Sequence, residues 1–377
     1  MTRSFRHWLS AAVFVAPMLS ASAQTVVFSN SPAPLAIPRR ASIILVVADG
    51  LGYGDLSCYG QAKFQTPNLD KLAAEGTRYT QYEGDTDGAR GFLALMTGKT
   101  SRPISATVAQ MLENAGYHTG MVGDWPLGDE RSPDAPWKRG FAEFGGYLDE
   151  NDAKNFYADY IWSFNPNYTY VGGTNAWVEW KEGAGPHNAG REMLYVNTRG
   201  KHQYIPDLLT KVTMNFIDAN VPDAFNRYRP FFLVVHYPIP GDGKSVVPSD
   251  APYSGEPWPQ PQKNKAALVS RFDGYVGQLR DHLAKHGLTN NVALFVTSDA
   301  IARGGGGLDP NFFHSNVASN DFRVPLVAGW PGGFPAGAVS DLKCSAKDFL
   351  PTAAGIGYAK VPAGVDGVSL LSSAKPK

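Results

Sequence analysis

Residues 42–49 read SIILVVAD, a continuous apolar run that is rich in β-branched side chains and ends in an aspartate. A strand that is buried on both faces of a parallel sheet has this pattern. Similar apolar runs recur along the chain, at 118–123, 231–236, 291–297 and 324–329. Segments with helical spacing lie between them, at 66–76, 105–116, 206–220 and 266–285. This alternation predicts an α/β fold with a large, mostly parallel central sheet flanked by helices.

Local signals indicate where two of these helices begin. Pro67 suits the first position of the helix that Gly76 ends. Ser105 is the expected N-cap of the next helix, because its hydroxyl can accept a hydrogen bond from a free backbone N–H.

Composition excludes two broad classes. The 377-residue chain has 34 Lys and Arg against 34 Asp and Glu, so its formal net charge is zero. A general nucleic-acid-binding protein would carry a basic excess, and no nucleic-acid partner is expected. Hydrophobic residues make up 43% of the chain and charged residues 18%, which excludes a fully disordered chain.

The N-terminus has the features of a signal peptide, with Arg3 and Arg6 before an apolar run at 8–19 and small residues at 21–23. We expect cleavage of 1–23, a leader at 24–40, and a secreted or periplasmic protein. The apolar run is too short to span a bilayer, so no membrane span is expected.

Cys58 and Cys344 allow at most one disulfide. The remaining residues, 41–377, form the predicted domain, with 129–200 as an insertion or lid.

Polar residues at strand ends are the candidate site. Asp49 and Asp299 each follow an apolar strand, and Asp124 and His236 end two others. An open parallel sheet places its site beyond the carboxyl ends of its strands. Adjacent buried carboxylates repel one another unless a cation or a proton neutralises them, which indicates a divalent metal at Asp49 and Asp299. Alternatively, each aspartate caps the turn that follows it, and His236 is a packed core residue.

Several segments resemble the sulfatases of the alkaline-phosphatase superfamily. They include IILVVADGLGYGDLSCYG (43–60), TPNLDKLAAEGTRYTQYE (66–83), ALMTGK (94–99) and VALFVTSD (292–299), and the likeness runs in collinear order over about 41–370. The resemblance implies a large sheet between helices and a smaller C-terminal subdomain, which looks reduced or absent in this chain. It also implies sulfate-ester hydrolysis by a formylglycine made from Cys or Ser in a Cys/Ser-x-Pro-x-Arg motif, with a divalent cation and Lys and His side chains around the sulfate.

The nucleophile region departs from that pattern. Residues 84–90 read GDTDGAR and contain no cysteine, so no formylglycine is expected. Two alignments stay open: one puts Thr86 at the nucleophile and Arg90 at the arginine, and the other, without gaps, puts Gly88 and Phe92 there. Thr86 would have to attack directly, as threonine does in phosphate-cleaving relatives. Alternatively, this stretch is only a solvated turn.

The implied metal and sulfate ligands are also depleted. Asp49 and Asp299 remain, whereas Ca²⁺ usually takes six to eight oxygen ligands. The family's lysine and histidine in Gly-Lys-Trp-His-Leu-Gly correspond to Asp124 and Pro126, a further histidine to Gly241, and a downstream lysine falls near His314. The site should therefore be neutral or negative and repel a sulfate.

Three hypotheses follow. The first is a non-catalytic sulfatase homologue that binds a ligand or partner, such as a small molecule or glycan, in the old cleft through residues such as Asp124 and His236, or has only a scaffold role. The second is an active sulfate- or phosphate-ester hydrolase with Thr86 as nucleophile, Arg90 as anion clamp, and Asp49, Asp299 and His314 at a metal. The third is a remade cation site from the acidic residues Asp49, Asp85, Asp87, Asp124 and Asp299. We favour the first. The sequence leaves the oligomeric state open.

Overall fold

The structure is a computed structural model. It describes residues 40–148, 156–157, 160–164, 178–179, 191–196, 204–221, 229–240, 247–301 and 322–372, and residues 40–377 cluster as one compact unit. The strands are β1 (Ser42–Asp49), β2 (Thr77–Tyr79), β3 (Tyr82–Glu83), β4 (His118–Asp124), β5 (Glu143–Tyr147), β6 (Tyr160–Phe164), β7 (Val178–Glu179), β8 (Arg191–Val196), β9 (Phe231–Pro240), β10 (Val292–Ser298), β11 (Leu326–Gly329), β12 (Ala338–Ser340) and β13 (Cys344–Ser345). The α-helices are α1 (Pro67–Glu75), α2 (Gly88–Thr97), α3 (Val108–Asn114), α5 (Ile205–Asn220), α6 (Gln260–Lys285) and α7 (Phe349–Gly357). Short 3-10 helices are η1 (Tyr53–Asp55), η2 (Ser57–Tyr59), η3 (Pro136–Lys138), η4 (Thr289–Asn291), η5 (Ala346–Asp348) and η6 (Leu370–Ser372).

The central sheet has the strand order β12-β2-β11-β10-β1-β9-β4-β5-β6-β8-β7. Its middle strands, β10, β1, β9, β4 and β5, are parallel, and antiparallel pairs flank them on both sides. The predicted fold class, a large and mostly parallel α/β sheet, is confirmed. The expected strand at 324–329 forms as β11, which runs antiparallel to β10.

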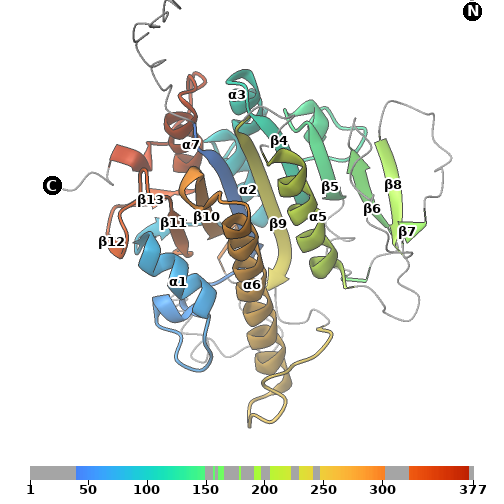
Figure 1. Cartoon of the computed structure of the whole chain (residues 1–377), viewed down its shortest axis with the longest axis vertical. Helices are drawn as coiled ribbons and strands as arrows, with labels where there is room; N and C mark the ends of the chain where they lie inside the picture. Colours follow the sequence, from blue (N-terminus) through green and yellow to red (C-terminus); the bar gives the residue numbers. More distant parts are fainter. Residues whose placement is uncertain are drawn as a thin grey trace, which may run out of the picture. The chain divides into compact units, whose positions relative to one another are not determined.

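Two layers of helices cover the sheet (Figure 1). Alternate residues of β1 point to opposite faces: Ile44 and Val46 pack in the core that contains residues of α1, α5 and α6, and Ile43 and Leu45 pack in the core that contains residues of α2, α3 and α7. Both sides of β1 are therefore apolar, which explains its unbroken hydrophobic run.

The described strands of the 129–200 stretch, β5 to β8, extend one flank of the sheet. The interpretation of this stretch as an insertion or lid stays a prediction, and much of it lies outside the described residues. Within it, the Phe156 side chain is buried and meets the Tyr204 ring edge-on, with centroids 5.7 Å apart.

The cap of α3 differs from the prediction. Thr107, not Ser105, is the N-cap, because its hydroxyl accepts a hydrogen bond from the backbone N–H of Gln110 at 3.1 Å. The Gln110 side chain accepts in return from the Thr107 backbone N–H, which completes a capping box. The predicted Pro67 at the start of α1 is confirmed.

Several predictions concern residues outside the described part. The signal peptide (1–23), nearly all of the leader (24–40) and His314 belong to this group, and the secreted or periplasmic location stays a prediction. In the part of the chain that the structure describes, no helix has both the length and the apolar character of a membrane span. Cys58 and Cys344 are both free thiols, so the one disulfide that the sequence allowed is not formed.

Candidate functional site

Parallel pairing brings the candidate residues to one edge of the sheet. His236 of β9 lies opposite Val47 of β1 and Gly123 of β4, and Ala48 pairs with Ser298. Asp49, Asp124 and Asp299 follow these paired positions directly, so their side chains gather around His236. Because these parallel strands are in register, their carboxyl ends meet at one place, as expected for the site of an open parallel sheet.

His236 is the centre of the cluster. Its side chain is 1% exposed, and its Nδ1–H donates a hydrogen bond to the backbone oxygen of Asp124 at 2.9 Å. The other ring nitrogen, Nε2, lies 3.4 Å from Oδ2 of the buried Asp299. At that length, and without hydrogen-bond geometry, the contact is an ion pair rather than a strong hydrogen bond. Oδ1 of Asp299 accepts from the backbone N–H of Gly50 at 3.0 Å.

The electrostatic environment makes this imidazole cationic. Burial lowers the pKa of His236, but the contact with Asp299 and its charge, together with the charges of Asp124 and Asp49, outweigh that effect and raise the pKa to about 9. The Phe92 ring is stacked on the imidazole at 4.7 Å between centroids and 9° between planes, a geometry that favours a cation over a ring face. A protonated histidine therefore occupies the middle of the acidic cluster at neutral pH.

Helix α2 begins against this cluster. Asp87 is its N-cap, and its Oδ1 accepts from the backbone N–H of Arg90 at 2.9 Å. A Cβ atom placed on Gly88 would lie 2.6 Å from Oδ2 of Asp299. A Cβ on Gly91 would lie 1.7 Å from the backbone oxygen of Asp299, so only glycine permits this approach of helix to strand end. Gly88 thus faces Asp299 and has no side chain, and Phe92 faces His236 with its phenyl ring.

Thr86 and Arg90 lie on the exposed side of the same segment. Arg90 binds the Asp85 carboxylate through two hydrogen bonds, Nε to Oδ2 at 2.7 Å and Nη2 to Oδ1 at 2.6 Å, and its Nη2 also donates to Thr86 Oγ1 at 3.2 Å. Partial burial raises the pKa of Asp85, but the hydrogen bond and charge of Arg90 outweigh it and lower the pKa. The Arg90 charge is therefore engaged by Asp85. The assignment of Thr86, Arg90 and His314 as catalytic stays a prediction.

The residues present do not fit a Ca²⁺ ion well. Asp299 already faces the His236 imidazole and a backbone N–H, Asp85 binds Arg90, and Asp87 caps α2. Asp49 and Asp299 offer few of the six to eight oxygens that Ca²⁺ prefers. This set of ligands therefore does not support a reaction step that depends on a metal. The metal assignment of Asp49 and Asp299 stays a prediction.

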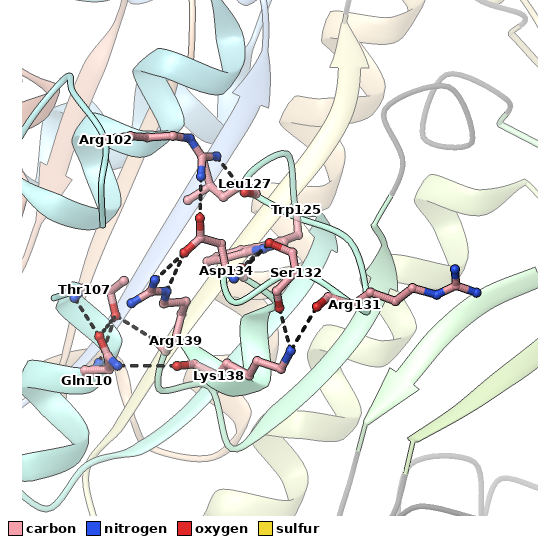
Figure 2. Close-up of polar contacts among 10 residues, drawn as sticks. All are labelled: Arg102, Thr107, Gln110, Trp125, Leu127, Arg131, Ser132, Asp134, Lys138 and Arg139. Carbon is pink, nitrogen blue, oxygen red and sulfur yellow. Dashed lines mark hydrogen bonds and ion pairs between the residues drawn. The ribbon is translucent and has the colours of Figure 1, made fainter. Parts of the chain in front are cut away.

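A second polar network holds together the loop after β4 (Figure 2). The carboxylate of Asp134, buried in that loop, forms ion pairs with both Arg102 and Arg139. Arg102 also donates to the backbone oxygen of Leu127 at 2.6 Å, and the Trp125 indole N–H donates to the backbone oxygen of Asp134 at 2.9 Å. The Trp125 ring meets the Phe92 ring edge-on, with centroids 5.6 Å apart. The network thus positions Trp125, which in turn packs against the Phe92 ring that stacks on His236.

We expect Asp134→Asn to destabilise the fold by about 2 kcal/mol, because it removes the charge that satisfies two arginines, one of them mostly buried. Urea denaturation followed by circular dichroism measures the loss. Asp129→Asn, at an exposed position of the same loop, is the matched control, with a change within about 0.5 kcal/mol. Equal stabilities of the Asp134 and Asp129 variants would show that the ion pairs contribute nothing.

Sequence reasoning did not single out Asp134, or a group formed by Asp218, His282 and His286. Arg102 comes from another loop, 32 residues before Asp134, and Arg139 lies five residues after it, so no recognised spacing signals the group. His282 lies in the helix predicted at 266–285, and His286 follows directly after it, four residues on, a spacing that is typical of a shared helix face. Their acidic partner on α5 becomes visible only in the tertiary structure.

Comparison with known proteins agrees with this fold. The family model described as Sulfatase matches residues 41–357. Arylsulfatase A of Homo sapiens is 29% identical over 365 residues, covering 88% of this chain and 66% of that protein. The arylsulfatase of Hemicentrotus pulcherrimus is 28% identical over 372 residues, covering 88% of this chain and 60% of that protein. The crystal structure of Ps i-CgsB in complex with k-i-k-neocarrahexaose superposes with a TM-score of 0.66 at 26% identity, covering 89% of this chain and 76% of that chain.

Two findings define the class of protein. Acidic groups gather at the ends of the parallel strands, and one family model matches most of the chain. The chain belongs to the sulfatase family, within the alkaline-phosphatase superfamily of hydrolases. Members of this family typically bind a divalent cation. The chain spans 60–66% of the length of the two arylsulfatases.

Proposed function

We propose that this sulfatase-family protein has no formylglycine-type sulfuric-ester hydrolase activity and binds a small-molecule or glycan ligand at the strand ends instead. One observation carries the proposal. Gly88 begins the helix against the acidic cluster, and a Cβ at this position would lie 2.6 Å from Asp299 Oδ2. The place where the gapless alignment expects the nucleophile thus has no side chain, and one could be added only if the Asp299 carboxylate moved.

The neighbouring positions support the same conclusion. In the gapless alignment Phe92 stands at the family's arginine, and its ring stacks on His236. One imidazolium faces three carboxylates, those of Asp49, Asp124 and Asp299, so the cluster has a negative formal charge. A sulfate group would be repelled there, because Coulomb repulsion is strong where water is largely excluded.

A glycan is the ligand class that a relative supports. Ps i-CgsB, 26% identical to this chain, was solved with k-i-k-neocarrahexaose. Because the cluster in this chain is negative, we expect neutral oligosaccharides to bind in preference to their sulfated forms. Isothermal titration with matched neutral and sulfated oligosaccharides measures the preference, and tighter binding of the sulfated member would contradict it.

The activity test uses the purified chain with aryl sulfates, aryl phosphates and sulfated glycans, with and without Ca²⁺, Mn²⁺ and Zn²⁺. We expect release of sulfate or phosphate at the background rate, and the same rate for Thr86→Ala. Mass spectrometry of the peptide that contains residues 84–99 should show an unmodified mass. The competing function, hydrolysis with Thr86 as nucleophile, requires a turnover that Thr86→Ala abolishes, and this result would overturn the proposal.

A further inference from the structure

Helices α5 and α6 end beside one another, away from the acidic strand ends. The C-terminal end of α5 leads towards the start of β9, and that of α6 leads to the start of β10. These turns therefore lie at the amino edge of the parallel strands, whereas the cluster around His236 lies at the carboxyl edge. What the helix ends hold is independent of the proposed function.

Three ligand-capable side chains meet at these helix ends. Asp218 belongs to the last turn of α5, and His282 belongs to the last turn of α6, with His286 as its C-cap. The backbone N–H of His286 donates to the backbone oxygen of His282 at 3.2 Å, so the chain is still helical there and both rings lie on one face. The ligand atoms of the three residues all lie within 4.8 Å of one another.

The two imidazoles compete for one carboxylate oxygen. Nε2 of His282 and Nε2 of His286 each lie 2.8 Å from Oδ1 of Asp218. The His282 contact is a hydrogen bond, whereas Nε2 of His286 is shielded from water and has no hydrogen-bond partner among the described residues. The carboxylate contact therefore satisfies this ring nitrogen only in part, and a metal ion bound by its lone pair would satisfy it fully.

We propose that Asp218, His282 and His286 form a surface site for a divalent transition-metal ion, and that Zn²⁺ is the ion that fits this ligand set best. Two imidazole nitrogens and one carboxylate are common zinc ligands, with a water molecule in the fourth position. Half of the Asp218 side chain is exposed, which leaves room for that water. Tetrahedral zinc bonds of about 2.0–2.1 Å separate ligand atoms by about 3.3 Å, so each Nε2–Oδ1 distance of 2.8 Å would lengthen by about 0.5 Å.

The helix ends add to the preference for a cation. The carbonyl groups of the last turn give each helix a partial negative charge at its C-terminus, and two such ends meet at this site. Ca²⁺ and Mg²⁺ prefer oxygen ligands, so the two nitrogens should discriminate against both ions. The bound ion would link α5 to α6 and stabilise the fold, because the unfolded chain does not hold the three ligands together.

Isothermal titration of the chelator-treated full chain with Zn²⁺ alone tests the site. We expect one equivalent with a Kd of about 10 μM or tighter, and no binding of Mg²⁺ at the same concentrations. His282→Gln, His286→Gln and Asp218→Asn should each weaken binding at least about tenfold. Asp281→Asn, an exposed carboxylate beside His282, is the control and should leave the Kd unchanged.

A second readout separates loss of binding from loss of folding. Zn²⁺ at about 100 μM should raise the Tm of the wild-type chain by a few degrees and leave the Tm of the His282→Gln/His286→Gln double variant unchanged. Circular dichroism of the metal-free variants checks that they are folded. The proposal is overturned if Zn²⁺ does not bind, or if the folded double variant binds it as tightly as the wild type does.

Discussion

Lys265→Met is expected to destabilise the protein by about 3–5 kcal/mol, because it breaks a fully buried ion pair. Lys265 and Asp55 form this pair with side chains that are 2% and 0% exposed, and Nζ lies 3.0 Å from Oδ2. The same carboxylate oxygen accepts from the backbone N–H of Gly52 at 2.7 Å. Burial raises the pKa of Asp55, although the Lys265 charge opposes this change. Without Lys265 the buried Asp55 carboxylate would lose the cation that it pairs with.

The ion pair connects α6 to η1, which follows the loop from Asp49 and Gly50. Its loss should therefore loosen the loop that supplies the N–H contact to Asp299.

Denaturant unfolding of three variants measures the effect. Lys263→Met, which removes a partly buried lysine from the same helix, should cost less than about 1 kcal/mol. The double variant Asp55→Asn/Lys265→Met should recover much of the loss, because it removes both charges. If the double variant is no more stable than Lys265→Met, an unpaired charge is not the cause.

Stability should fall as the pH rises from about 6.5 to about 9, by roughly 2–4 kcal/mol, because of His236 alone. In the unfolded chain a histidine has a pKa of about 6.5, whereas in the folded protein the pKa of His236 is raised to about 9. The folded state thus holds a proton that the unfolded state has released. This contribution is complete below the unfolded pKa and disappears as the pH passes through the folded one.

The facing groups determine the controls for this experiment. Asp49 in β1, Asp124 in β4 and Asp299 directly after β10 supply the negative charges. Helix α2 contributes the uncharged Phe92 ring. Urea unfolding at pH 6, 7, 8 and 9, as the difference between the wild type and His236→Gln, isolates the His236 contribution from those of the other histidines. Asp299→Asn should reduce the slope, since it removes the main partner. If the free energy of unfolding depends on pH in the same way for the wild type and for His236→Gln, the prediction that His236 is a buried cation is wrong.

The candidate site was only partly predictable. Apolar strands that end in Asp49 and Asp299 identify the edge of the sheet, because the carboxyl ends of parallel strands meet there. The alignment of the nucleophile region stayed open, since Thr86 and Gly88 both have plausible neighbours in the sequence. In the fold, Gly88 faces Asp299 and Thr86 lies on the exposed side beside Arg90. Helix geometry explains this arrangement, because it puts residues 88 and 92 on one face.

The sequence by itself determined the fold class, because periodic burial of side chains is written directly into the order of apolar residues, as in β1 and α6. It also determined that the nucleophile region contains no cysteine. Only the tertiary structure decided which partners the polar side chains have: His236 with Asp299, Lys265 with Asp55, and Asp218 with two histidines of α6. The physical reason is that a hydrogen bond or an ion pair depends on distances of about 3 Å between groups far apart in the chain, and no local pattern encodes those distances.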